Sequence, residues 1–132
     1  MTLLYLASPY SGTRELEDER WKAIAEITDR FRRIGVAAYS PVALWHPIAR
    51  QLDLPQNFFT YSAVDLEMLR RCDAFVIVPL PGWLSSRGME EEWRAAREEN
   101  LPCMILDILT LVSTTIDWYS WPTKQESLWI GK

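Results

Sequence analysis

Short, almost wholly apolar runs of strand length recur along this sequence, and each is followed by a turn. The clearest is AFVIV (74–78), which is apolar throughout and partly β-branched. TLLYLA (2–7), VAAYS (36–40) and PCMILDIL (102–109) have the same character. Runs that are apolar at nearly every position are typical of strands covered on both faces of a sheet.

Helical spacing fills most of the sequence between these runs. One helix is expected from about residue 15 to residue 33, closed by Gly35, and two more over FTYSAVDLEMLRR (59–71) and GMEEEWRAAREEN (88–100). Residues 41–57 hold three prolines and are expected to form a loop with a short helix. The last stretch, from residue 110, shows no clear period.

Strands that alternate with helices predict an α/β fold with a parallel sheet. Because the crossovers are right-handed, we expect a three-layer sandwich of the flavodoxin-like or Rossmann-like kind, formed by a single domain over residues 1–132. Ligands of such sheets bind beyond the carboxyl ends of the strands, where the strand order reverses. The segments to search are therefore SPYSG (8–12), SPVALWHP (40–47) and PLPGWLSSRGMEEEW (79–93).

Composition argues against several classes of function. A net charge of −4 gives no electrostatic footprint for a nucleic-acid polymer, and no apolar run approaches the roughly 20 residues that span a membrane. The N-terminal stretch lacks the basic region of a signal peptide, so a cytoplasmic protein is expected. With one histidine, and with Cys72 and Cys103 interpreted as buried thiols, we expect no metal and no cofactor.

The stretch SSRGMEEEW (85–93) places three carboxylates behind a serine pair and a glycine. If Ser86 caps a helix, acidic residues in its first turns are ordinary, and this interpretation is favoured for Glu90 and Glu91. Glu92 lies four residues after Gly88 and four before a small alanine, on the stripe expected to face the sheet. A carboxylate there has no obvious cationic partner, which indicates a functional group.

Other polar and aromatic residues near strand ends keep two interpretations each. Asp65 can be a capping residue or an acid of the site, whereas Asp73 is expected to end a helix. The hydroxyls and N–H groups at two turns can cap helices or bind an anion. The aromatic side chains can belong to the core or stack on a base, and His46 can be structural or a general acid. The residues concerned are Ser85, Ser86, Ser11 and Gly12 for the anion, and Tyr5, Tyr10, Trp45 and Trp83 for the base.

DLEMLRRCDAFVIV followed by SSRGMEEEWRAA resembles the signature of the nucleoside 2-deoxyribosyltransferase superfamily, and YLASPYSG is similar to its first strand and substrate loop. The resemblance covers residues 3 to about 106. It is strongest to the branch of deoxynucleoside 5′-monophosphate N-glycosidases and cytidine-monophosphate hydrolases. PVALWHPI together with PLPGW is most similar to small bacterial and phage proteins of unassigned function.

The resemblance implies a role for several residues. Glu92 matches the nucleophile, Asp65 the aspartate that supports the sugar and the nucleophile, and Ser86 the serine that binds the 5′-phosphate. Tyr5 matches the tyrosine of the first strand. The implied substrate contacts are Tyr5, Ser8, Tyr10, Ser11, Gly12, His46, Trp83, Ser86 and Gly88. Ser11 stands where the monophosphate branch usually has a basic residue, for which Arg14 or Arg87 are the substitutes, and SRG departs from the usual residues before the glycine.

The implied reaction cleaves or transfers the N-glycosidic bond of a nucleoside or nucleoside 5′-monophosphate through a covalent glycosyl-glutamate. The candidates for protonating the base are His46, Asp73, Tyr10 or a group from a neighbouring subunit. The superfamily is typically oligomeric, so a homo-oligomer is expected, with the tryptophans of the tail (Trp118, Trp121, Trp129) in an interface or in the core. The alternatives are a non-catalytic nucleotide-binding or sensing module and an NAD glycohydrolase.

Overall fold

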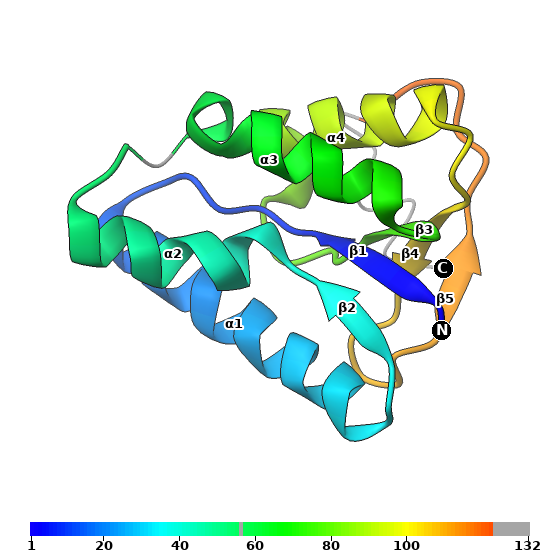
Figure 1. Ribbon diagram of the computed structural model, residues 1–132, viewed down its shortest axis with the longest axis horizontal. Coiled ribbons are helices and arrows are strands. Elements are labelled where there is room, and N and C mark those ends of the chain that lie inside the picture. The colour runs from blue at the N-terminus through cyan, green and yellow to red at the C-terminus, as the bar shows by residue number, and fades with distance from the viewer. Residues whose placement is uncertain (56, 123–132) are drawn as a thin grey trace.

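The computed structural model describes residues 1–55 and 57–122, which form one five-stranded sheet with helices on both of its faces (Figure 1). The strands are β1 (Leu3–Ala7), β2 (Ala37–Tyr39), β3 (Ala74–Ile77), β4 (Cys103–Leu106) and β5 (Ser113–Thr115). The helices are α1 (Arg14–Arg33), α2 (Pro41–Leu52), α3 (Phe58–Arg71) and α4 (Arg87–Glu98), with a 3₁₀ turn η1 (Trp83–Ser85).

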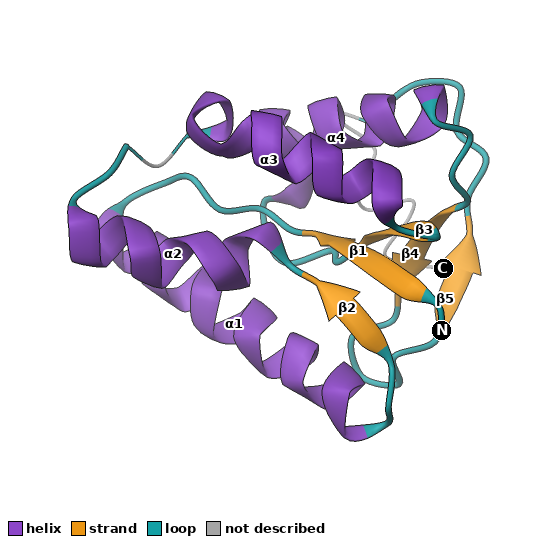
Figure 2. Cartoon of the chain, viewed as in Figure 1, coloured by secondary structure: helices purple, strands orange, loops and turns teal. Residues whose placement is uncertain are grey.

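The strand order is β2-β1-β3-β4-β5, and β1 to β4 are parallel. Helices α1 and α2 cover one face of the sheet and α3 and α4 the other, as Figure 2 shows. The prediction of a three-layer α/β sandwich is therefore confirmed. Two apolar clusters, one on each face of β1 and β3, join the sheet to these helices.

The edge strand β5 runs antiparallel to β4, which the sequence pattern did not predict. Its connection to β4 is only six residues long, too short for the crossover that a parallel partner requires. The carboxylate of Asp107 accepts the N–H groups of Leu109 and Thr110 and so tightens this turn. The chain can therefore return only along the neighbouring edge of β4.

The helix α2 is longer than expected, because it spans 12 of the residues predicted to be a loop with a short helix. Ser40 caps it, and Pro41 stands at its first position, where a missing N–H costs nothing. Pro47 lies inside the helix and cannot donate to the carbonyl of Ala43 four residues earlier. The indole Nε1 of Trp21 donates to that carbonyl instead (3.3 Å), so a side chain from α1 compensates for the proline.

Tryptophans form the core on the α4 side. Trp83 is wholly buried, stacks on Trp118 and meets Trp121 edge-on, while Trp121 donates from Nε1 to the carbonyl of Leu84 (2.9 Å). Trp118 and Trp121 are therefore core residues of this chain, and Trp129 lies outside the described residues.

Over residues 1–55 and 57–122, no helix combines the length and apolar character needed to cross a membrane.

Candidate functional site

A cavity of about 370 Å³ lies at the carboxyl edge of the sheet, within the size range of small-molecule sites. The loops that follow β1 and β3 form two of its walls, and these neighbouring strands have crossovers that leave in opposite directions. The beginning of α2, the first turns of α3 and the beginning of α4 complete it. The lining residues are Ser8–Ser11, Arg20, Pro41, Val42, Trp45, Phe58, Tyr61, Asp65, Gly82, Ser85–Met89 and Glu92.

Glu92 reaches this cavity from the second turn of α4 and is 7% exposed. Its Oε2 accepts a hydrogen bond from the hydroxyl of Tyr5, and no Arg, Lys or His pairs with it in the part of the chain that the structure describes. Burial raises the pKa of Glu92 to about 8, helped by the charge of Asp65 and opposed by the hydrogen bond from Tyr5. The neighbouring Glu90 and Glu91 pair with Arg94 at the surface, as expected for ordinary helix acids.

Asp65 is the second buried acid of the cavity and comes from α3. Its Oδ1 accepts hydrogen bonds from the hydroxyl of Tyr39 and from Nε1 of Trp45, each 2.8 Å long. Burial raises the pKa of Asp65, and these two donors partly offset the shift. Both donors bind the same oxygen, which leaves Oδ2 without a protein donor among the described residues.

The pairing of β1 with β2 explains why the donors to the two acids lie together. Tyr5 and Tyr39 are register partners in adjacent parallel strands, so their side chains leave the same face of the sheet, with ring centroids 5.7 Å apart. One ring donates to Glu92 and the other to Asp65. Two carboxyl groups of the cavity wall and two tyrosines behind them therefore form one polar cluster, of which only Tyr39 is not fully buried.

The N-terminus of α4 supplies hydroxyl and N–H groups to the opposite wall. Ser86 caps the helix by accepting from the N–H of Met89 (3.2 Å), and Ser85 donates to the carbonyl of Gly82. Arg87, the first residue of the helix, is exposed and has no ion pair within the described ranges. On the facing wall the hydroxyl of Ser8 is buried without a hydrogen-bond partner in the described structure. An anion at this helix end would meet a positive local potential.

Arg20 is a second cation of the cavity wall. Its guanidinium donates to the carbonyls of Tyr10 (3.3 Å) and Ser11 (2.9 Å) after β1, and to Pro81 (3.1 Å) in the loop after β3. No carboxylate forms a salt bridge with it in residues 1–55 and 57–122. The side chain therefore clamps the two loops together while its positive charge stays uncompensated by direct contact.

Seven of the residues that the resemblance implies lie on the cavity wall: Glu92, Asp65, Ser8, Tyr10, Ser11, Ser86 and Gly88. Tyr5 lies behind the wall, where it binds Glu92. The other three do not line the cavity. Trp83 is buried in the tryptophan core, the N–H of Gly12 donates to Glu17 (3.2 Å), and His46 is buried behind Tyr10.

Two further sequence-based candidates lie away from the cavity. Asp73 precedes β3, at the amino edge of the sheet, where it accepts the N–H of Leu3 (2.7 Å), so it cannot protonate a base at the opposite edge. Arg14 begins α1 and is exposed outside the lining, whereas Arg87 does line the cavity. Of the two basic residues considered for a phosphate, the structure brings only Arg87 to the cavity.

Sequence reasoning missed Tyr39 and Arg20. The position of Tyr39 at the end of an apolar run carried a signal, since residues at strand ends face the ligand edge. Arg20 carried no such signal, because it lies inside a helix and acts through backbone carbonyls of two distant loops.

Among the described residues no group of three or more His, Cys, Asp or Glu is placed to hold a metal ion, and both cysteines are buried free thiols.

Comparison with known proteins gives one family. A family model described as Domain of unknown function (DUF1937) matches residues 2–108, which contain the whole cavity lining. No curated protein matches the chain.

Proposed function

We propose that this chain, which belongs to the Domain of unknown function (DUF1937) family, cleaves or transfers the N-glycosidic bond of a nucleoside or a nucleoside 5′-monophosphate. The observation that carries the proposal is Glu92: a buried carboxyl group that pairs with no cation in the described part of the chain, hydrogen-bonded by Tyr5 and opening on a cavity of nucleoside size. Such a group is costly to ionise, and it is stabilised when positive charge develops beside it. Cleavage of an N-glycosidic bond develops that charge on the sugar.

In the proposed reaction the ionised carboxylate of Glu92 attacks C1′ of the sugar as the bond to the base breaks, and the electron pair of that bond leaves with the base. This gives a glycosyl-glutamate intermediate and a free base. Water, or a second base, then attacks C1′ from the face that the first base left, so that the sugar keeps its configuration. Tyr5 holds the carboxyl group in position for both steps.

Asp65 is assigned to a sugar hydroxyl. Its Oδ1 is held by Tyr39 and Trp45, which fixes the carboxylate and leaves Oδ2 to accept from the ligand. Trp45 also stacks on Tyr61, with ring centroids 5.0 Å apart, and both line the cavity. These rings offer a flat apolar wall to the nucleoside.

The 5′-phosphate of a nucleotide substrate is assigned to the wall formed by the N-terminus of α4. Ser85, Ser86 and Arg87 line it, together with the charge of Arg20 and the hydroxyl of Ser8, which has no hydrogen-bond partner among residues 1–55 and 57–122. A helix N-terminus with two guanidinium groups nearby favours a dianion over a neutral 5′-hydroxyl. We therefore expect the monophosphate to be the better substrate.

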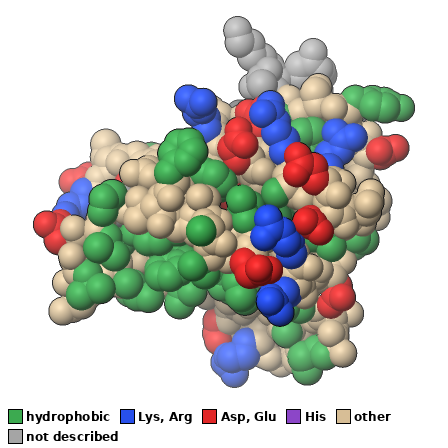
Figure 3. Space-filling model, turned by 45° about the horizontal axis from the view of Figure 1, so that its top comes forward, with side chains coloured by type: hydrophobic (Ala, Val, Ile, Leu, Met, Phe, Trp, Pro, Cys, Tyr) green, Lys and Arg blue, Asp and Glu red, His purple; other side chains and the backbone are tan. Residues whose placement is uncertain are grey.

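A homo-oligomer is part of the proposal. The helices that supply Trp45, Phe58 and Tyr61 to the cavity also expose apolar side chains to solvent: Leu44, Leu52, Phe59 and Val64. Figure 3 shows hydrophobic side chains gathered over one half of the face in view, with charged side chains of both signs over the other. A second copy that covers α2 and α3 would bury this surface. Sedimentation of Phe59→Asp should then show dissociation, whereas Ile34→Asp, at the end of α1, should not.

The test of the activity is a panel of nucleosides, nucleoside 5′-monophosphates and NAD, incubated with the protein and assayed by chromatography for a released base. We expect release from one class of nucleoside or monophosphate, complete loss in Glu92→Ala and full activity in Glu91→Ala, whose side chain is at the surface. A 2′-fluoro analogue should leave a sugar adduct on Glu92, detected by mass spectrometry. Ligand binding without release of any base would support a sensing module, and nicotinamide release would identify an NAD glycohydrolase.

A further inference from the structure

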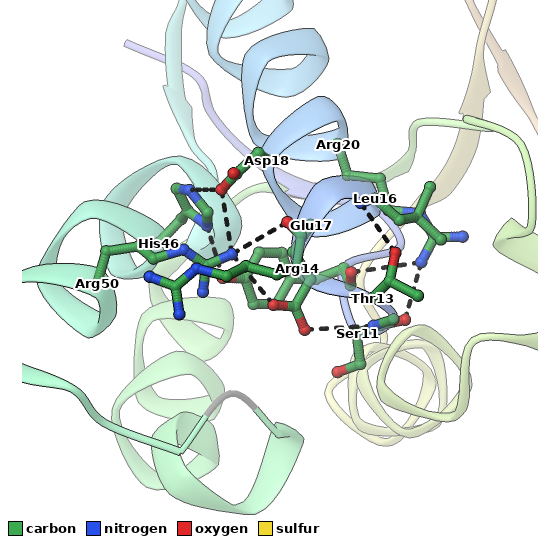
Figure 4. Close-up of polar contacts among 11 residues, drawn as sticks. Ser11, Thr13, Arg14, Leu16, Glu17, Asp18, Arg20, His46 and Arg50 are labelled. Atoms are coloured by element: carbon green, nitrogen blue, oxygen red, sulfur yellow. Dashed lines mark hydrogen bonds and ion pairs between the residues drawn. The ribbon is translucent and has the colours of Figure 1, made fainter.

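His46 is the buried centre of a hydrogen-bonded network, with a half-exposed Asp18 on one side and a half-buried Tyr10 on the other, that the proposed reaction has not used. The imidazole is 5% exposed and stacks on Trp21, with ring centroids 5.2 Å apart. Nε2 lies 3.1 Å from Oδ1 of Asp18, and Nδ1 lies 2.6 Å from the hydroxyl of Tyr10. Figure 4 shows His46 and Arg50 from α2 reaching toward Asp18 and Glu17 on α1.

The partners fix the proton positions on the ring. A carboxylate can only accept, so Nε2–H donates to Asp18, and in the neutral ring Nδ1 accepts from the hydroxyl of Tyr10. Once the ring is protonated, Nδ1–H donates to the oxygen of Tyr10, whose own proton can then point elsewhere. Arg50 holds the carboxylates in place by contacts to Asp18 (3.0 Å) and Glu17 (3.3 Å).

The Tyr10 end of this hydrogen-bonded network opens on the cavity. Tyr10 lines it together with Glu92 and Asp65. Two other hydroxyl groups of the lining, on Ser85 and Tyr61, donate to the backbone carbonyls of Gly82 and Pro55. The hydroxyl of Tyr10 is hydrogen-bonded to a titratable group instead, the imidazole of His46. Burial raises the pKa of Tyr10 to about 12, so its hydroxyl stays protonated at neutral pH.

We propose that Asp18, His46 and Tyr10 form a proton relay that protonates the departing base, an inference that rests on the proposed glycosidase function. As the bond from C1′ to the base nitrogen breaks, its electron pair stays on the base, and C1′ bonds to the Glu92 oxygen. The base takes the proton of the Tyr10 hydroxyl, and Tyr10 takes the Nδ1 proton of the imidazolium. His46 is left neutral and recovers a proton from the water that opens the glycosyl-glutamate.

The groups around His46 set the pH at which the relay is loaded. Glu17 and Asp18 face it from α1, Arg50 from α2 and Tyr10 from the loop after β1. Burial, and then Arg50, hold the pKa of His46 below its usual value, while Asp18 and Glu17 oppose them. The relay needs the imidazolium and the reaction needs the Glu92 carboxylate, so kcat/KM should have a bell-shaped pH profile. Between the pKa values of His46 and Glu92, the loss of imidazolium offsets the gain of carboxylate as pH rises. Above about pH 8 Glu92 is already ionised and only the loss of imidazolium continues, so kcat/KM should fall there.

The test compares each nucleoside that is cleaved with its cationic N-methylated form: inosine with 7-methylinosine, and cytidine with 3-methylcytidine. A methylated base leaves without needing a proton. Tyr10→Phe and His46→Gln should lower kcat/KM about 100-fold or more on the parent nucleoside and less than about threefold on the methylated one. Tyr119→Phe, an exposed tyrosine, is the matched control and should leave both rates unchanged.

A second readout is the pH profile on the parent nucleoside alone. In His46→Gln the fall of kcat/KM above pH 8 should disappear, because the rate then follows only the ionisation of Glu92. Equal losses on parent and methylated substrates, or an unchanged alkaline limb, would refute the relay while leaving the glycosidase function intact. A wild type that releases base from no substrate would remove both proposals.

Discussion

The hydroxyl of Tyr5, on β1, donates a hydrogen bond to Oε2 of Glu92, on α4, across a sequence separation of 87 residues. Tyr5 has no exposed surface and Glu92 almost none. The loss of hydration on burial raises the pKa of Glu92 by more than this hydrogen bond lowers it, and the result is a pKa of about 8. At neutral pH the fold therefore holds a largely protonated acid at the floor of its cavity.

This raised pKa predicts how stability depends on pH. The carboxyl binds a proton more tightly in the folded chain than in the unfolded chain, whose value is near 4.5, so its contribution is fully present below pH 4.5 and is lost as pH rises toward 8. The difference between 4.5 and about 8, at about 1.4 kcal/mol per pKa unit, gives a loss on the order of 5 kcal/mol. Glu92→Gln should abolish this loss and be the more stable protein at pH 8.5, measured by urea unfolding.

Glu91→Gln is the control for that measurement. Glu91 lies on the same helix at the surface, 3.6 Å from Arg94, and its change should alter the free energy of unfolding by less than about 0.5 kcal/mol at either pH. If both variants show the same pH dependence as the wild type, Glu92 does not have a raised pKa.

Removing the donor should move the acid in a known direction. Tyr5→Phe deletes the hydrogen bond that lowers the pKa of Glu92 and leaves the burial that raises it. The stability loss between pH 4.5 and 8 should then extend to higher pH. On an N-methylated nucleoside, which needs no acid, kcat/KM rises with pH as Glu92 ionises. In Tyr5→Phe this rise should occur about one pH unit higher than in the wild type, and kcat/KM should return to the wild-type value at high pH. A pH-independent loss of rate would instead indicate a misplaced carboxyl group.

Asp65→Asn should separate charge from structure at the second acid. The amide oxygen can still accept from Tyr39 and Trp45, so the fold and melting temperature should change little. The charge that would bind the sugar hydroxyl is lost, which corresponds to about a 10- to 100-fold decrease in kcat/KM. Steady-state kinetics with Tyr39→Phe alongside would show whether the loss comes from the ligand contact or from a repositioned carboxylate.

The clamp of Arg20 can be tested at Gly82. This glycine has φ of +90°, and a Cβ there would clash with Nη2 of Arg20. Gly35 has φ of +77° and open space around it, so Gly35→Ala measures the backbone strain alone, about 1–2 kcal/mol. Gly82→Ala should cost more than Gly35→Ala and should also weaken binding of a 5′-monophosphate, measured by calorimetry. Equal costs and unchanged binding would show that Arg20 moves aside freely.

Much of this fold was predictable, because its signals are local. Continuous apolar runs marked β1, β3 and β4, and helical spacing marked α1, α3 and α4 within one or two residues. The capping role of Ser86 and the inward face of Glu92 also followed from position along one helix. By contrast, the length of α2 and the strand β5 depended on distant partners: Trp21, which compensates for Pro47, and the edge of β4.

The sequence by itself determined the segments that form β1 to β4 and α1, α3 and α4, and that an acid at position 92 would face the sheet, since periodicity and capping act over a few residues. Only the tertiary structure decided what surrounds that acid. It brought Tyr5 to Glu92, Tyr39 and Trp45 to Asp65, and Arg20 to the carbonyls of two loops. Desolvation and hydrogen bonding between residues far apart in the chain depend on how the layers pack, and no local pattern encodes them.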